Sequence, residues 1–204
     1  LIMDLLAVLS GIMVSAYFSI GILFYILASR AYSFRGIRLK KYPLIAYLTV
    51  IVFQGAVTFA LVYHGSSSQK LLNVPVLPMI AASLLIGGFY PLTQIYQHDA
   101  DRKDGVLSIS ARLGYRGTFI FSAVVYSFAI GILGIYYTGF DQLPQFMLLT
   151  TLLLPVLVFF IKWAISVWRD ISAANFNNTM RLNVVASICT SIAFIMLIIW
   201  NQIE

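Results

Sequence analysis

The sequence predicts an all-α protein, a polytopic bundle of transmembrane helices. Of its 204 residues 61% are hydrophobic and only 10% are charged, whereas soluble domains carry about 25% charged residues. The apolar residues form six runs, each close to the roughly 17 to 25 residues that one spanning helix needs. The basic residues gather in alternate loops between these runs, as they do in membrane proteins. We therefore expect a multi-pass integral membrane protein with a single domain over residues 1–204.

The six apolar runs define the expected helices in chain order. The first run, Leu5 to Ser29, is long for one straight helix. We interpret Ser10-Gly11 as a turn between the tail of an earlier helix and a span from about Ile12 to Arg30. The later runs contain no Lys or Arg and predict one span each: Leu44 to Tyr63, Val76 to Gln97, Thr118 to Phe140, Phe146 to Ile161 and Leu182 to Trp200.

The third of these spans contains residues that disturb a regular helix. Gly87 and Gly88 have no side chain, and Pro91 has no backbone N–H to donate. The group predicts one of two structures. Either the helix bends and lines a cavity, or the small residues let a neighbouring helix pack closely against it.

Lys and Arg are distributed very unevenly between the loops. Twelve of the thirteen follow the first and third spans or surround the fifth, and the intervening loops contain only Lys70. Basic loops face the cytoplasm, so we expect these loops on the cytoplasmic side of a bacterial or archaeal membrane. Contact with anionic membrane lipid is an alternative role for them. The net charge of +6 thus reports topology, and nothing indicates binding to nucleic acid.

The densest group of charges follows the third span. Three carboxylates and two cations stand within six residues: Asp99, Asp101, Arg102, Lys103 and Asp104. If the helix continues past Gln97, then Gln97, Asp101 and Asp104 share one face while Asp99 points elsewhere. Mg²⁺ takes one or two carboxylates together with waters and phosphate oxygens. The segment therefore predicts a metal-bridged diphosphate site, with a solvated charged loop as the alternative.

Three segments carry motifs in a recognisable order. The first is Asp101-Arg102-Lys103-Asp104-Gly105 with Ser108 to Ser110 and Arg112-Leu113-Gly114; the others are Tyr32-Ser33 with Arg38-Leu39-Lys40, and Asn175 to Asn183. They resemble the second Asp-rich motif, the Tyr-Ser and basic loop signature, and the Asn-rich start of the last helix in the UbiA superfamily of intramembrane prenyltransferases. The similarity covers essentially the whole chain.

The resemblance implies a nine-helix bundle in which two Asp-rich cytoplasmic loops bind Mg²⁺ and an isoprenyl diphosphate. This chain would supply about six of the nine spans and lacks the first Asp-rich motif. We therefore expect the natural protein to extend N-terminally by roughly 80 to 100 residues, about three further spans with their loops. One departure concerns Gln97, which stands where the motif has its first Asp and offers a neutral carbonyl oxygen instead.

The resemblance also implies roles for individual residues. Mg²⁺ is expected on Asp101 with Asp99 or Asp104, and Gln97 is a candidate ligand. The diphosphate is expected to bind four cations: Arg38, Lys40, Lys103 and Arg102. Tyr32 would steady an allylic cation through its ring or hydrogen-bond the diphosphate, with an interfacial belt tyrosine as the alternative. Three further residues are candidates for the cavity rim: Asn178, Arg181 and Lys162.

These expectations describe an enzyme similar to the 4-hydroxybenzoate polyprenyltransferases. It would move a polyprenyl group from an allylic diphosphate to a hydrophobic or aromatic acceptor that resembles a quinone precursor. Transfer to a porphyrin or to a glycerol-phosphate lipid is the alternative within this class, and a non-catalytic lipid-binding or transport bundle lies outside it. Transporters place ionisable residues near the membrane midplane, but the interiors of the predicted spans contain no Asp, Glu, Lys or Arg.

Overall fold

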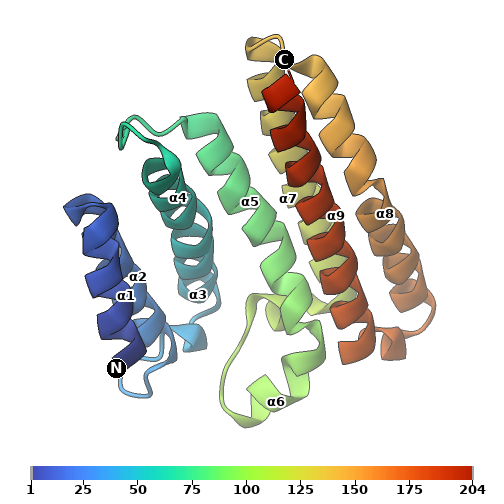
Figure 1. Ribbon diagram of the computed structural model, residues 1–204. Coiled ribbons are helices and arrows are strands. Elements are labelled where there is room, and N and C mark those ends of the chain that lie inside the picture. Colours follow the sequence, from blue (N-terminus) through green and yellow to red (C-terminus); the bar gives the residue numbers. More distant parts are fainter. Residues whose placement is uncertain (1, 204) are drawn as a thin grey trace.

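The computed structural model describes residues 2–203, and all regular elements in that range are helical. The α-helices in Figure 1 are α1 (Ile2–Val14), α2 (Ala16–Ser33), α3 (Pro43–Val50), α4 (Thr58–Ser66), α5 (Val76–Gln94), α6 (His98–Lys103), α7 (Ile109–Gly139), α8 (Leu143–Arg169) and α9 (Phe176–Ile203). A π-helix, Ile51–Val57, joins α3 to α4. Three short 3₁₀ turns complete the fold: Leu39–Lys41, Ile95–Gln97 and Ile171–Ala173.

Five helical segments are long and apolar enough to cross a membrane. They are Pro43–Ser66, Val76–Lys103, Ile109–Gly139, Leu143–Arg169 and Phe176–Gln202. These segments correspond to the last five predicted spans and confirm the multi-pass helical bundle. Their outward faces carry many exposed large apolar side chains, as a surface that contacts lipid requires.

A turn divides the first apolar run into two helices, as predicted, but it lies further along the chain. The predicted position at Ser10-Gly11 is wrong, since α1 continues through both residues and the chain turns at Ser15. The Ser15 hydroxyl accepts the Phe18 N–H at 3.0 Å and caps α2. Gly11 serves packing instead, because a Cβ there would lie 3.0 Å from Ser19 Cα. Neither α1 nor α2 is among the five spans.

The main hydrophobic core lies between α5, α7, α8 and the start of α9. Its buried members are Leu92, Ile95, Phe119, Phe160, Trp163, Val167 and Leu182. Phe119 occupies the centre, with its ring centroid 5.6 Å from Phe160 and 4.9 Å from Trp163. This core sets the relative position of the helices that carry the acidic segment.

Glycines bring α5 unusually close to its neighbours. A Cβ on Gly87 would lie 2.6 Å from the Tyr47 hydroxyl oxygen, and one on Gly55 of the π-helix would lie 2.4 Å from Ser83 Cα. A Cβ on Gly88 would lie 3.0 Å from the Tyr126 ring on α7. These distances confirm the close packing that the small residues predict.

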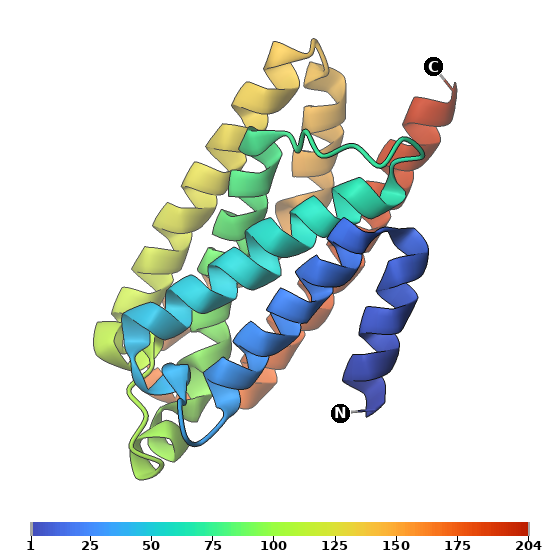
Figure 2. The same cartoon turned by 90° about the vertical axis from the view of Figure 1, so that its left-hand side faces the viewer.

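All three basic loops lie at the same end of the bundle (Figure 1). They are the α2–α3 connection, the segment from α5 through α6 to α7, and the α8–α9 connection. The N-terminal end of α1 lies there too, where Asp4 forms an ion pair with Arg30 of α2. Figure 2 shows α1 at the edge of the bundle beside α2. We call this the polar end of the bundle.

A buried histidine joins three segments at the opposite end. The Ser15 hydroxyl donates to His64 Nε2 of α4 at 2.7 Å, and His64 Nδ1 donates to the Leu71 carbonyl at 3.1 Å. The tautomer follows from Leu71, because a carbonyl oxygen can only accept. This contact ties the α1–α2 turn to the end of α4 and to the loop that follows it.

Candidate functional site

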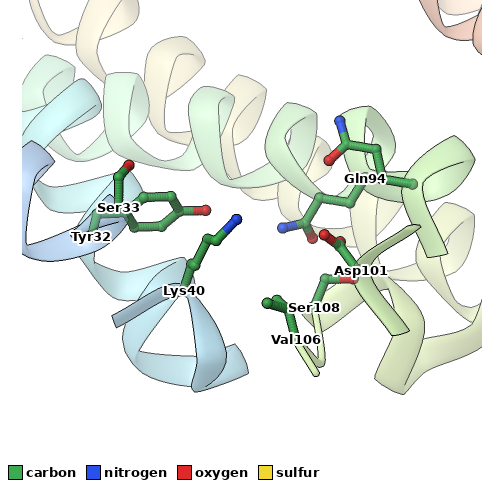
Figure 3. A pocket seen from close by; sticks show the side chains of 8 residues that line it. Tyr32, Ser33, Lys40, Gln94, Asp101, Val106 and Ser108 are labelled. Carbon is green, nitrogen blue, oxygen red and sulfur yellow. The ribbon is translucent and has the colours of Figure 1, made fainter. Parts of the chain in front are cut away.

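A cavity of about 190 Å³ opens at the polar end of the bundle. Its lining residues come from two of the three polar loops and the adjoining helix ends: Tyr32, Ser33, Lys40, Gln94, Gln97, Asp101, Val106 and Ser108. Figure 3 shows Tyr32 and Lys40 on one side, with Gln94 and Asp101 on the other. The Lys40 amine points across the cavity toward the wall that carries Asp101 (Figure 3).

The acidic wall is built by a change of helix type after α5. α5 ends at Gln94, a 3₁₀ turn that ends at Gln97 follows, and α6 carries Asp101 four residues further along the cavity. Gly105, with φ +66°, then reverses the chain, which glycine does without steric cost. The Val106 N–H donates back to the Asp101 carbonyl at 2.8 Å, so the returning chain closes the wall behind the carboxylate.

A buried hydrogen-bond network supports this wall from behind. Ser110 is its centre: the Ser110 hydroxyl contacts His98 Nε2 at 2.8 Å and the Thr118 hydroxyl at 3.0 Å. The Ser110 N–H donates to Gln94 Oε1 at 3.4 Å. All four side chains are buried. His98 therefore packs into the bundle although it stands in a strongly charged segment.

The opposite wall carries hydroxyl groups and a cation. The hydroxyl of Tyr32, in the last turn of α2, lies 2.5 Å from the hydroxyl of Tyr90 on α5. Burial raises the pKa of the Tyr32 hydroxyl, and the hydrogen bond with Tyr90 opposes that shift. Tyr32 is consequently a neutral phenol at neutral pH and can donate a hydrogen bond. Lys40 follows in the α2–α3 connection and lines the same wall.

An ion pair joins the basic and acidic loops beside the cavity. Arg38 Nη2 lies 3.0 Å from Asp104 Oδ2, and Arg38 Nη1 also donates to the Asp104 carbonyl at 3.5 Å. α6 ends one residue before Asp104, whose side chain is 64% exposed. Neither residue lines the cavity, so the expected shared face of Gln97, Asp101 and Asp104 holds only for the first two.

The structure brings together four of the residues predicted for the site: Tyr32, Lys40, Gln97 and Asp101. Three others on α6 are exposed to solvent: Asp99, Arg102 and Lys103. They lie close to the cavity along the chain but do not line it. Their charges belong to the surface around the cavity.

The candidate rim residues of the third loop also lie outside the cavity lining. Lys162 and Arg181 are exposed. Asn178 has a structural role, because its N–H donates to Asn175 Oδ1 at 3.0 Å and its Nδ2 donates to the Ala173 carbonyl at 2.9 Å. These bonds satisfy backbone groups at the start of α9.

Four cavity residues were not among the predicted site residues, although two of them stand in the motif segments: Ser33, Gln94, Val106 and Ser108. Gln94 had a detectable signal, since it precedes Gln97 by three residues and shares a helix side with it. Ser108 could also have been found, because its hydroxyl accepts the Ala111 N–H and caps α7. Val106 closes the acidic wall through the hydrogen bond of its N–H to the Asp101 carbonyl. A backbone contact of this kind leaves no pattern in the sequence.

The donor set fits Mg²⁺ that is shared with a phosphate group. Asp101 is the one carboxylate that lines the cavity, and residues 2–203 hold no group of three or more His, Cys, Asp or Glu side chains suited to a metal ion. Mg²⁺ usually binds through one or two carboxylates plus waters and phosphate oxygens. Asp101 and the Gln97 amide oxygen could hold it in that way, but they form no complete protein cage.

The two walls of the cavity carry opposite charges. Lys40 on one wall and Asp101 on the other interact electrostatically, and neutral hydroxyl and amide groups lie between them. Such a site can bind a cation and an anion together.

No protein-family model, curated protein or solved structure matches this chain. The resemblance carried by its motifs thus stays a prediction.

Proposed function

We propose that this protein is a membrane-embedded, Mg²⁺-dependent prenyltransferase that moves a polyprenyl group from an allylic diphosphate to an aromatic acceptor related to quinone precursors. The observation that carries the proposal is the cavity at the polar end, where Asp101 and Lys40 occupy opposite walls. A metal-bridged diphosphate needs both an anionic and a cationic wall. The surrounding apolar helices suit a substrate with a long hydrocarbon tail.

The dimensions of the cavity agree with a diphosphate headgroup. A volume of about 190 Å³ equals that of roughly six water molecules at about 30 Å³ each. That space suits a diphosphate with a cation and is small for a polyprenyl chain. The chain would lie outside the cavity, against the exposed apolar side chains of the bundle, where it gains from leaving water.

The proposed reaction breaks the bond between prenyl C1 and the diphosphate oxygen, and the electron pair leaves with the diphosphate. A ring carbon of the acceptor bonds to C1, and the ring then releases its proton to the departing diphosphate. Lys40 would neutralise charge on the leaving group, and the Tyr32 hydroxyl would donate a hydrogen bond to it. When bound at Asp101 and Gln97, Mg²⁺ would supply further positive charge.

The proposal places the polar end on the cytoplasmic side of the membrane. Twelve of the thirteen Lys and Arg residues belong to the loops or helix ends there, which is the distribution that the positive-inside rule describes. The exposed cations Arg102 and Lys103 would attract an anionic substrate toward the cavity. Arg38 would assist only after leaving Asp104.

The test is Asp101→Asn in the full-length protein, assayed for Mg²⁺-dependent consumption of farnesyl diphosphate. We expect at least a 100-fold loss of kcat/KM, because a charged metal ligand contributes several kcal/mol and each 1.4 kcal/mol is tenfold. Asp99→Asn is the matched control, since Asp99 is exposed outside the cavity. Equal activity of the Asp101 variant and the wild type, or an equal loss in both variants, would remove Asp101 from the site.

A further inference from the structure

The two glutamines of the cavity present opposite ends of their amide groups to it. Gln94 and Gln97 both line the cavity, and each amide has one end engaged by a neighbour whose hydrogen-bonding role cannot change. A side-chain amide has an acceptor oxygen on one side and a donor nitrogen on the other. The neighbour therefore determines which end remains for a ligand.

Gln94 is oriented by the first turn of α7. The Ser110 N–H donates to Gln94 Oε1 at 3.4 Å. N–H groups in the first turn of a helix have no partner within that helix, and the neighbouring Ser108 hydroxyl already accepts from Ala111. Turning the amide around would set Nε2 against a buried N–H. Oε1 thus stays on Ser110. Nε2 carries two hydrogens, of which one can reach Tyr90 and the other is left for the cavity.

Gln97 has the opposite orientation. Its Nε2 donates to the Thr93 carbonyl at 3.3 Å and to the Tyr96 hydroxyl at 2.9 Å. A carbonyl oxygen only accepts, so the reversed amide would place two oxygens against each other. Nε2 is consequently engaged, and the carbonyl oxygen of Gln97 remains available on the wall that carries Asp101.

We propose that Gln94 is an anion-binding residue that donates Nε2–H to a phosphate oxygen, while Gln97 offers its oxygen to the cation. The proposal rests on the proposed function and adds a residue to its site. Gln94 is only 8% exposed, and a buried donor binds an anion more strongly than an exposed one does. The Gln94 donor and the Gln97 acceptor thereby stand only three residues apart in the chain.

The hydroxyl pair connects Gln94 with the opposite wall of the cavity. The Gln94 side chain also interacts with Tyr90, whose hydroxyl lies 2.5 Å from that of Tyr32. If Gln94 donates to the Tyr90 oxygen, Tyr90 donates to Tyr32. The Tyr32 hydroxyl then has its hydrogen left for the cavity. Gln94 and Tyr32 would contact the same anion from adjacent positions.

The experiment titrates inorganic pyrophosphate into the full-length protein in detergent micelles at a series of Mg²⁺ concentrations and measures the heat of binding. Gln94→Glu keeps an acceptor for Ser110 but replaces the donor with a negative charge, so we expect pyrophosphate Kd to rise about 10- to 100-fold at saturating Mg²⁺. Gln94→Met removes the donor without adding a charge, and about a tenfold rise is expected.

Gln97→Met is the matched control on the same wall. It should raise the Mg²⁺ concentration for half-maximal pyrophosphate binding about tenfold, because one oxygen ligand is lost. Pyrophosphate Kd at saturating Mg²⁺ should stay within about threefold of wild type. The two glutamines are distinguished by which quantity changes. Gln94 variants should change the pyrophosphate Kd at saturating Mg²⁺, and the Gln97 variant should change the Mg²⁺ concentration for half-maximal binding.

The outcomes separate this inference from the proposed function. If wild type binds pyrophosphate and Gln94→Met binds it equally well, the role of Gln94 is overturned while the proposed function stands. If both Met variants lose the same affinity at saturating Mg²⁺, the division between donor and acceptor is overturned. If wild type binds no pyrophosphate at any Mg²⁺ concentration, the proposed function itself fails.

Discussion

The contact between Gly55 and Ser83 permits a quantitative test of how the two walls of the cavity are held. In Gly55→Ala the new Cβ would lie 2.4 Å from Ser83 Cα and 2.9 Å from Ser83 N. Ordinary van der Waals contacts begin at 3.4 Å. Both neighbours are backbone atoms, which cannot rotate away as a side chain can. The π-helix and α5 must therefore separate by about 1 Å.

The expected cost follows from this overlap. Inserting a methyl group into a packed region costs about 1 to 3 kcal/mol. For a chain of this size each kcal/mol lowers Tm by about 2 to 4 °C, so Gly55→Ala should melt about 2 to 12 °C below wild type. The shift in α3 would also move Lys40, which precedes that helix, and pyrophosphate affinity should fall with Tm.

The assay is thermal unfolding in detergent micelles, followed by circular dichroism at a helical wavelength. Gly131→Ala is the control, because a Cβ there has nothing within 4 Å, and alanine forms helix more readily than glycine. That variant should melt at or above the wild-type temperature. If Gly55→Ala melts with wild type, or Gly131→Ala loses as much, the close approach of the two helices is refuted.

Two further predictions concern residues away from this contact. Asp104→Asn should cost less than about 1 kcal/mol, since the Asp104 carboxylate that pairs with Arg38 is 64% exposed. Pyrophosphate affinity by calorimetry should stay within about threefold; a tenfold loss would place Asp104 in the site. Phe119→Ala should cost about 3 to 5 kcal/mol in chemical unfolding, because the ring is fully buried against Phe160 and Trp163. A cost below 1 kcal/mol would contradict the packing of the core.

The bundle was predictable because its main determinant is local. A run of apolar residues long enough to span a membrane becomes a helix, since no other structure satisfies its backbone in lipid. The turn at Ser15 was not predictable from such a run. Gly11 resembles a turn residue locally, but its partner is Ser19 on the next helix, and that contact exists only after the two helices pack.

The site was predictable where it depends on spacing along the continuous helical segment Val76–Lys103. Gln97 and Asp101 line the cavity together, as their separation of four residues predicts. Asp104 departs from the pattern because α6 has ended and Arg38, from a distant loop, attracts its carboxylate. Gln94 was missed because its orientation depends on Ser110, which lies on the far side of a chain reversal.

α2 is anchored near both of its ends by hydroxyl groups, and this constrains its rotation. Ser15 bonds to His64 at one end and Tyr32 bonds to Tyr90 at the other, about 25 Å apart along the helix axis at 1.5 Å per residue. A helix attached at one point can turn about its axis, but one attached at both ends cannot do so freely. The direction in which Tyr32 points from the axis of α2 is thus set in part by His64, a histidine at the opposite end of the bundle.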